Sequence, residues 1–259
     1  MSARLTVLGG SAAGVGTGQG CSGYYVEYAG TRIVLDLGPA TLLELRKHTD
    51  FRTLDGVVIS HLHLDHILDL FAMRFALTYN PQPPSRRTPL WLPPGGRTML
   101  AGVASLFAAP GELDTIFSNQ FEVAEFDPDQ ALCIGDVRLS FAPTVHYVPC
   151  WAIRVTGGES GDLVYTADTG PAADLAGICR GAEVLIAEAT LLTPDDEPWD
   201  SRGHLTADEA AELAKSADAQ TLVLTHIWEE MEPQRLMDRA AQIFPGRLER
   251  AQPGLTLRW

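Results

Sequence analysis

Short apolar runs alternate with segments of helical spacing along most of the chain. Runs rich in β-branched and aromatic residues predict strands, and apolar residues three and four positions apart predict helices. The predicted strands cover residues 5–8, 24–28, 32–35, 57–59, 137–141, 151–155, 163–166, 184–186, 222–224 and 255–259. The predicted helices cover residues 42–48, 64–78, 97–107, 207–216 and 233–244. Many strands accompanied by helices indicate a layered α/β architecture.

The loops between these segments are too short to act as domain linkers. The loop-like stretches cover residues 80–88, 93–96 and 193–203, and an independent second domain would normally be joined by a longer connection. A chain of 259 residues, of which 46% are hydrophobic, can supply one sizeable core. We therefore predict a single domain spanning residues 1–259.

Charge and cysteine usage limit the partners and the compartment. The formal net charge is −14, and the densest basic run is only Arg86-Arg87, so tight binding of long nucleic acid is not expected. No window reaches 18 uninterrupted apolar residues, and glycines interrupt the short apolar stretch near the N-terminus, so neither a membrane span nor a signal peptide is predicted. The four cysteines form no CxxC pair, which favours free thiols in a reducing compartment. We predict a cytoplasmic protein.

The strongest chemical signal is a run of histidines and an aspartate that follows a β-branched strand. The run reads His61-Leu-His63-Leu-Asp65-His66. Alternate residues point the same way in an extended chain, and His66 would join them as the chain turns into the next helix. Imidazole and carboxylate groups are ligands that zinc, manganese and iron accept. This spacing is far more specific than an isolated His-x-His pair.

Three further candidate ligands also follow predicted strands. They are His146, Asp168 and His226. Strand ends provide rigid positions that can converge at one edge of a sheet, which a metal site requires. The sequence therefore predicts one metal centre built from His61, His63, Asp65, His66, His146, Asp168 and His226.

Over nearly its full length, this pattern resembles that of the metallo-β-lactamase-fold hydrolases. The resemblance implies an α/β fold that is a four-layer αββα sandwich, with the site at one edge. It also implies two divalent metal ions, zinc by expectation, with manganese or iron as alternatives. By the same resemblance, one ion would be held by His61, His63 and His146, the second by Asp65, His66 and His226, and Asp168 would bridge them. Asp65 would also help to orient the nucleophile, and Asp36 would have a supporting role.

Two residues outside the ligand set bear on the reaction. His204 lies just before Thr206-Ala-Asp-Glu209, a capping-box pattern that predicts the start of a helix. The segment resembles a histidine motif of ribonuclease Z-like phosphodiesterases, although Leu205 separates His204 from Thr206 here. In that group the histidine stabilises the phosphoryl group or protonates the leaving group. Glu188 resembles the glutamate that supports it, so we expect His204, Glu188 and Asp65 to be catalytic.

The chain departs from ribonuclease Z in lacking room for a long tRNA-binding arm. In family members that arm lies between the segments that match His146 and Asp168, which are only 22 positions apart here, with a glycine-rich turn over residues 157–161. Together with the acidic charge, this short connection argues against tRNA processing. The segment order is similar to that of small cyclic-nucleotide phosphodiesterases of this fold.

The leading hypothesis is a metal-dependent phosphodiesterase acting on a small anionic substrate, such as a cyclic nucleotide. The alternatives are a lactonase or another carboxyl-ester or thioester hydrolase with the same metals, a tRNA 3′-processing endonuclease, and a non-catalytic metal-binding protein. Phe71, Tyr147, Trp199 and Trp228 are candidates to line the substrate pocket. The resemblance also suggests a homodimer.

Overall fold

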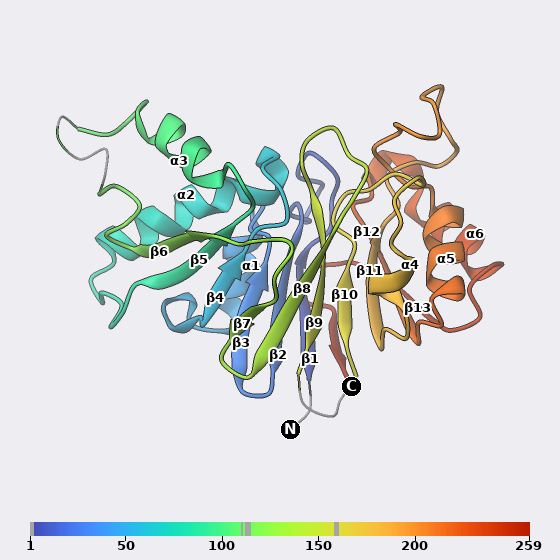
Figure 1. Ribbon diagram of the computed structural model, residues 1–259, viewed down its shortest axis with the longest axis horizontal. Helices are drawn as coiled ribbons and strands as arrows, with labels where there is room; N and C mark the ends of the chain where they lie inside the picture. The colour runs from blue at the N-terminus through green and yellow to red at the C-terminus, as the bar shows by residue number, and fades with distance from the viewer. Residues whose placement is uncertain (1–2, 110, 112–114, 158–160) are drawn as a thin grey trace.

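Two seven-stranded mixed sheets form the centre of the molecule (Figure 1). The computed structural model describes residues 3–109, 111, 115–157 and 161–259. The first sheet has the order β14-β1-β2-β3-β4-β5-β6, and the second has the order β13-β12-β11-β10-β9-β8-β7. The first sheet contains β1 (Arg4–Gly9), β2 (Gly23–Tyr28), β3 (Thr31–Leu35), β4 (Gly56–Val58), β5 (Thr88–Leu92), β6 (Phe121–Glu125) and β14 (Thr256–Arg258). The second contains β7 (Leu132–Ile134), β8 (Val137–Pro143), β9 (Trp151–Thr156), β10 (Leu163–Tyr165), β11 (Val184–Glu188), β12 (Thr221–Thr225) and β13 (Arg247–Arg250).

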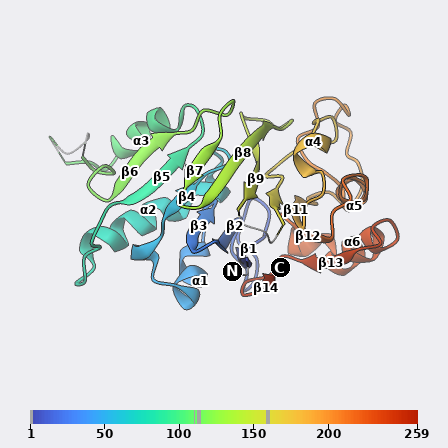
Figure 2. The same ribbon diagram turned by 60° about the horizontal axis from the view of Figure 1, so that its bottom comes forward.

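Helices cover the outer face of each sheet. Figure 2 shows α1, α2 and α3 on one side of the molecule and α4, α5 and α6 on the other. The first group consists of α1 (Thr41–His48), α2 (Leu64–Tyr79) and α3 (Gly96–Ala104). The second consists of α4 (Ala176–Cys179), α5 (Ala207–Ser216) and α6 (Pro233–Ala241). Two short 3₁₀ turns, η1 (Phe51–Thr53) and η2 (Glu229–Met231), complete the order of elements.

Alternation along the strands explains why the sheets are covered on both sides. In β3, Ile33 and Leu35 pack between the two sheets, whereas Val34 packs beneath the helices of the first side. In β11, Leu185 faces the helices of the second side and its neighbour Ile186 faces the other sheet. Successive strand side chains point to opposite faces, so strands buried on both faces read as unbroken apolar runs. The four-layer αββα prediction is confirmed.

Four strands were not predicted from the sequence, namely β5, β6, β7 and β13. Three of them lie at the ends of the sheets, where one edge is unpaired and charged residues are tolerated, so β6 and β13 read as Phe-Glu-Val-Ala-Glu and Arg-Leu-Glu-Arg. The fourth, β5, contains Pro89 and follows a proline-rich stretch, a pattern that argues against a strand. Two predicted helices are also shorter than expected, because α3 ends at Ala104 and α6 at Ala241.

Parallel pairing brings several chemically important strand ends to one edge of the second sheet. The strands β10, β11 and β12 are parallel neighbours, so the residues that follow them emerge together. Asp168 follows β10, Glu188 ends β11, and His226 follows β12. Across the described part of the chain, no helix has both the length and the apolar character needed to cross a bilayer.

Candidate active site

All seven predicted metal ligands converge in one small volume. Their ligating atoms form two overlapping groups, each with its atoms within 4.8 Å of one another. The groups are His61, His63, His146 and Asp168, and Asp65, His66, Asp168 and His226. Asp168 belongs to both groups, so one carboxylate joins the two halves of the site.

The carboxylate of Asp168 lies at the centre of four imidazole rings. Its Oδ2 atom is 3.7 Å from Nε2 of His61, 3.6 Å from Nε2 of His146 and 3.4 Å from Nε2 of His226. Its Oδ1 atom is 3.4 Å from Nε2 of His66. The two oxygens thus face different histidines, an arrangement that allows one carboxylate to contact two cations.

The start of α2 delivers two of the ligands. The helix begins at Leu64, where the predicted helix 64–78 also begins, so Asp65 and His66 both lie in its first turn. Asp65 therefore does not share the extended alternation expected of His61 and His63. Oδ2 of Asp65 lies 3.3 Å from Nε2 of His66 and 3.1 Å from Nε2 of His226. The helix can begin there because Gly38 passes close by: a Cβ atom on Gly38 would lie 1.9 Å from the carbonyl oxygen of Asp65.

Buried Asp36 orients two of the ligand histidines. Its Oδ2 atom accepts a 2.7 Å hydrogen bond from Nδ1 of His66 and a 2.7 Å bond from the hydroxyl of Ser60. The Ser60 hydroxyl in turn lies 3.0 Å from Nδ1 of His61. The phenol of Tyr165 also donates to Oδ2, at 2.8 Å. Partners on Nδ1 fix the ring orientation and leave Nε2 free to bind a cation.

His146 and His226 also point Nε2 into the site, and their Nδ1 atoms are held by residues on the opposite side of the site. Nδ1 of His146 donates to the carbonyl of Gly203 at 2.9 Å. Nδ1 of His226 lies 2.7 Å from the hydroxyl of Thr190, which donates to Oε2 of Glu188, also at 2.7 Å. His63 differs from these four, because its Nδ1 atom faces the site, 2.9 Å from Nε2 of His146.

Unfavourable backbone conformations accumulate at the strand ends that form the site. Asp36 has φ 56°, Ala167 has φ 53° and His226 has φ 55°. Residues other than glycine rarely adopt this left-handed region, and such strain is typical of functional sites.

The donor set fits divalent cations. In the described residues, Nε2 of His61 and Nε2 of His66 are buried without a hydrogen-bond partner, and leaving a buried polar atom unpaired is costly. Burial alone would raise the pKa of Asp168, but the imidazoles of His226 and His66 outweigh it and hold the pKa well below its ordinary value. A buried carboxylate surrounded by imidazole nitrogens matches the ligand preference of zinc and related metals.

Beside this cluster, His204 forms a pair with Glu188. Nδ1 of His204 lies 3.0 and 3.1 Å from the two carboxylate oxygens, and its ring centroid lies 5.0 Å from that of His146 and 5.4 Å from that of His226. Burial would lower the pKa of His204, but the Glu188 carboxylate raises it to about 9. The Glu188 carboxylate therefore favours the protonated form of the His204 imidazole, which lies against the cluster of candidate ligands.

The chain just after His204 is fixed by α5. Thr206 caps this helix, and a complete capping box with Glu209 confirms the predicted helix start. Glu188 also accepts hydrogen bonds from the backbone N–H groups of Thr169 at 2.6 Å and Leu205 at 3.2 Å. Both ends of the His204–Glu188 pair are therefore anchored to rigid elements.

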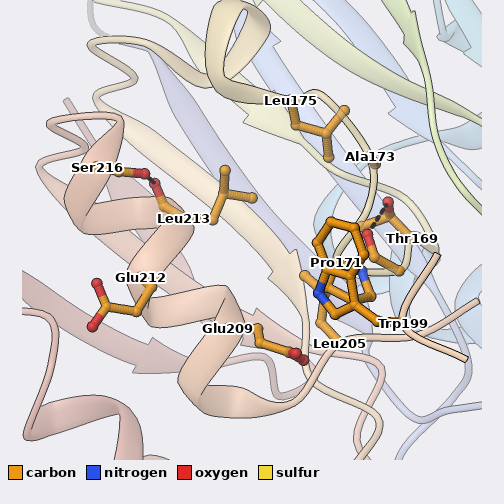
Figure 3. A pocket seen from close by; sticks show the side chains of 11 residues that line it. Thr169, Pro171, Ala173, Leu175, Trp199, Leu205, Glu209, Glu212, Leu213 and Ser216 are labelled. Atoms are coloured by element: carbon orange, nitrogen blue, oxygen red, sulfur yellow. Dashed lines mark hydrogen bonds between the residues drawn. The ribbon is translucent and has the colours of Figure 1, made fainter. Parts of the chain in front are cut away.

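Two of the four candidate pocket residues lie near the site. The ring centroid of Tyr147 is 5.1 Å from that of His146 and 5.6 Å from that of His204, and its hydroxyl donates to Glu197. Trp199 lines a neighbouring pocket of about 350 Å³. Figure 3 shows that pocket between α5 and the segment around Pro171. It touches the site through Thr169 and Leu205.

The other two candidates have different surroundings. Phe71 packs against Phe117 in the core beneath α2, with ring centroids 5.5 Å apart. Trp228 lies beside the N-terminal glycine-rich loop. Its Cζ3 atom is 3.4 Å from the position that a Cβ atom on Gly14 would occupy. Neither lines the pocket of Figure 3.

Sequence reasoning did not find the residues that support the ligands from behind. Thr190, Ser60 and Tyr165 each lie one hydrogen bond away from a ligand or its carboxylate partner. Hydroxyl groups are common in every part of a sequence, and only the folded chain shows which of them meet a histidine. Thr190 carried a weak signal, because it lies two positions after Glu188, just beyond the end of β11.

The chain matches the model of one protein family over most of its length. The family is described as the beta-lactamase superfamily domain, and the match covers residues 31–227. The chain is 28% identical over 255 residues to the probable metallo-hydrolase YhfI of Bacillus subtilis, over 97% of this chain and 98% of that protein. The crystal structure of YhfI covers 98% of this chain and 99% of its own, with a TM-score of 0.84.

Two further similarities involve proteins with named activities. A ribonuclease Z of Ignicoccus hospitalis is 25% identical over 301 residues, which cover 94% of each protein. A diphosphatase of the PhnP family has a crystal structure with a TM-score of 0.75 and 21% sequence identity, covering 99% of this chain and 98% of that one. At that identity the second similarity shows a shared fold alone.

Proposed function

Since the chain belongs to the metallo-β-lactamase superfamily and is a metal-dependent hydrolase, we propose that it hydrolyses a small phosphodiester such as a cyclic nucleotide. The proposal depends on the pair formed by His204 and Glu188. A two-metal site alone serves many hydrolytic reactions, whereas a protonated imidazole beside it suits a substrate that is already negatively charged.

Two groups of side chains would hold the metal ions. His61, His63 and His146 would hold one ion, Asp65, His66 and His226 the other, and Asp168 would contact both. We propose zinc, with manganese and iron as alternatives, because all three accept this mixture of nitrogen and oxygen ligands. When bound, such a pair activates water for attack and stabilises the charge that develops on the phosphoryl group.

His204 would act on the substrate itself. Its Nδ1 atom is engaged by Glu188, which leaves the Nε2–H group to donate to a phosphoryl oxygen or to the departing oxygen of the substrate. When the departing oxygen is an alkoxide, as in a cyclic nucleotide, it needs a proton, and a positioned imidazolium would supply it. Glu188 keeps the imidazole oriented and protonated. Asp65 would orient the attacking water as well as hold its ion.

The rim of the site favours a small substrate over a long nucleic acid. Between His146 and Asp168 the chain contains only a short loop, β9, the predicted turn and β10; residues 158–160 of that turn lie outside the described residues. Nearby, the exposed loop that carries Glu197 also contains Asp195, Asp196 and Asp200. Glu197 lies beside Tyr147 near the site, and four carboxylates in this one exposed loop would repel a polyanion, which argues against a tRNA-processing role.

The substitution His204→Ala tests this proposal. We expect kcat on cyclic AMP, whose departing alkoxide oxygen needs a proton, to fall about 10²-fold or more, the size of a lost general acid, while the metal content stays at the parent value. A carboxyl-ester, lactone or thioester hydrolase would lose little, because its substrate has a different charge and a different leaving group. Unchanged phosphodiester turnover in the metal-loaded variant would contradict the assignment of His204.

A further inference from the structure

A buried arginine ends the acidic loop beside the site. Arg202 follows the exposed stretch that carries Glu197 and three aspartates, yet its side chain is only 3% exposed. At the surface it could pair with those carboxylates at little cost, whereas a buried charge is expensive unless fixed partners receive it. The burial of Arg202 therefore directs attention to its partners inside the molecule, and these lie around His204.

The guanidinium of Arg202 binds two acceptors at once. Its Nε atom donates to the backbone carbonyl of His204 at 3.0 Å, and its Nη2 atom donates to Oε1 of Glu209. The second oxygen of Glu209 accepts from the backbone N–H and the hydroxyl of Thr206, at 2.8 and 2.9 Å. One buried cation therefore ties the first turn of α5 to the backbone of the residue that we propose as the proton donor.

The residues on either side of His204 are also held through their backbone. The carbonyl of Gly203 accepts from Nδ1 of His146 at 2.9 Å. The backbone N–H of Leu205 donates to Oε2 of Glu188 at 3.2 Å. His204 lies between these two contacts, and its own carbonyl is the one that Arg202 holds. Three consecutive residues thus each have a backbone hydrogen bond to a side chain of the site or of Arg202.

Close packing restricts the path of the same segment. A Cβ atom on Gly170 would lie 1.5 Å from the carbonyl oxygen of Arg202, and a Cβ atom on Gly203 would lie 2.7 Å from the ring of Tyr147. Both positions require glycine for this close approach. The segment is therefore packed as well as hydrogen-bonded, which is expected where a reacting group must be held to within about 0.5 Å.

We propose that Arg202 is a positioning residue for phosphodiester hydrolysis and acts through His204. By holding the carbonyl of His204 it fixes where the imidazole starts from, while Glu188 fixes the ring itself. This inference rests on the proposed role of His204 as the proton donor. Arginine suits the task because its planar fork serves a carboxylate and a carbonyl together, which the single ammonium group of lysine cannot do in the same geometry.

A purely structural role for Arg202 predicts different kinetics. If the arginine only stabilised α5, its loss would lower Tm and slow every reaction of the site alike. A positioning role predicts a loss that depends on the leaving group. The departing alkoxide of cyclic AMP needs the proton of His204, whereas p-nitrophenolate is stable as an anion and leaves without one. A reacting group misplaced by about 1 Å can cost as much as 10²-fold in rate.

The substitution Arg202→Lys in the metal-loaded chain separates these roles, because it keeps a cation for Glu209 but removes the Nε donor. We expect kcat on cyclic AMP to fall about 10-fold or more, kcat on bis-p-nitrophenyl phosphate to change less than about 2-fold, and the metal content to stay at the parent value. The matched control is Arg239→Lys. Arg239 donates from Nε and Nη2 to Asp208 in the first turn of α5, and its substitution should leave both rates unchanged. Equal losses on the two substrates in Arg202→Lys would overturn the proposal.

A double variant tests whether Arg202 acts through His204. Once His204→Ala has removed the proton donor, Arg202→Lys should cause no further loss of kcat on cyclic AMP, because residues that act as a unit are not additive. A further loss of about 10-fold in the double variant would show that Arg202 acts independently of His204, and it would overturn the proposal.

Amide hydrogen exchange tests the same contact without any turnover. We expect the backbone N–H of Leu205 to exchange about 10-fold faster or more in Arg202→Lys than in the parent, and at the parent rate in Arg239→Lys, because local opening sets this rate. Unchanged exchange in Arg202→Lys would overturn the proposal even in an active phosphodiesterase. Faster exchange in a protein whose parent hydrolyses no phosphodiester would instead refute the proposed function and show that Arg202 still holds the segment, so the two failures are distinguishable.

Discussion

At the scale of single residues, the site depends on hydrogen bonds behind the ligands as much as on the ligands themselves. Thr190 is the clearest case, because its hydroxyl joins His226 to Glu188. Glu188 in turn contacts His204. One hydroxyl therefore connects a metal ligand to the residue that we propose as the proton donor.

Removing that hydroxyl should weaken metal binding. Thr190→Val keeps the shape of the side chain but leaves Nδ1 of His226 without its partner, and we expect a loss of about 10–100-fold in metal affinity, measured by competition with a chelator. Thr190→Ser retains the hydroxyl and should restore most of the affinity. Parent-like affinity in the valine variant would contradict this role.

Glu188 should determine the alkaline limit of activity. Burial would lower the pKa of His204, but the Glu188 carboxylate raises it to about 9, and bound cations would lower it again. Activity that needs protonated His204 is present below this pKa and lost above it. Glu188→Gln removes the charge, so the alkaline limb of kcat against pH should move to lower pH. The same change at Glu197, which contacts Tyr147, should leave the limb in place. A limb that stays fixed or moves upward in Glu188→Gln would refute the pairing.

The sequence was enough to predict which histidines and aspartates come together, but not the residues that support them. A run such as His61-Leu-His63-Leu-Asp65-His66 is rare by chance, and His146, Asp168 and His226 could be recognised because each follows a strand. Ser60, Thr190 and Tyr165 are ordinary residue types in ordinary positions. Their importance comes from packing between strands that are far apart in the sequence.

At the scale of elements, the site depends on strand ends and helix starts. The strands β10, β11 and β12 carry Asp168, Glu188 and His226 to one edge, and α2 and α5 begin beside that edge. Apolar runs and the capping pattern were enough to predict these central elements. The edge strands β6 and β13 were missed because their unpaired edges allow charged residues that hide the strand pattern. The edge strand β7 was missed because it has only three residues.

The capping box of α5 should contribute measurably to stability. Thr206 accepts from the backbone N–H of Glu209 at 3.2 Å, and losing such a cap costs about 1 kcal/mol. For a chain of this size we expect Thr206→Ala to lower Tm by roughly 2–4 °C in a thermal unfolding scan. Thr98→Ala, at an exposed position inside α3, should change Tm by less. Equal melting temperatures for Thr206→Ala and the parent would show that the cap does not contribute to stability.

At the scale of the whole molecule, the two sheets and their helices bring distant segments together at one metal centre. The ligands come from the loop after β4, the start of α2 and the ends of β8, β10 and β12. The net charge of −14 and the short connection between His146 and Asp168 are the grounds on which we propose that a long nucleic acid is not the substrate. These features together support a small phosphodiester as the substrate.

Turnover of defined substrates by protein of known metal content tests the central claim most directly. The protein is stripped with a chelator, reloaded with zinc or manganese, and assayed on bis-p-nitrophenyl phosphate and cyclic AMP, with a p-nitrophenyl ester and a lactone alongside. We expect two ions per chain, phosphodiester hydrolysis that a chelator abolishes and metal restores, and slower turnover of the ester and the lactone. Two bound ions without chelator-sensitive turnover of either phosphodiester would contradict the account.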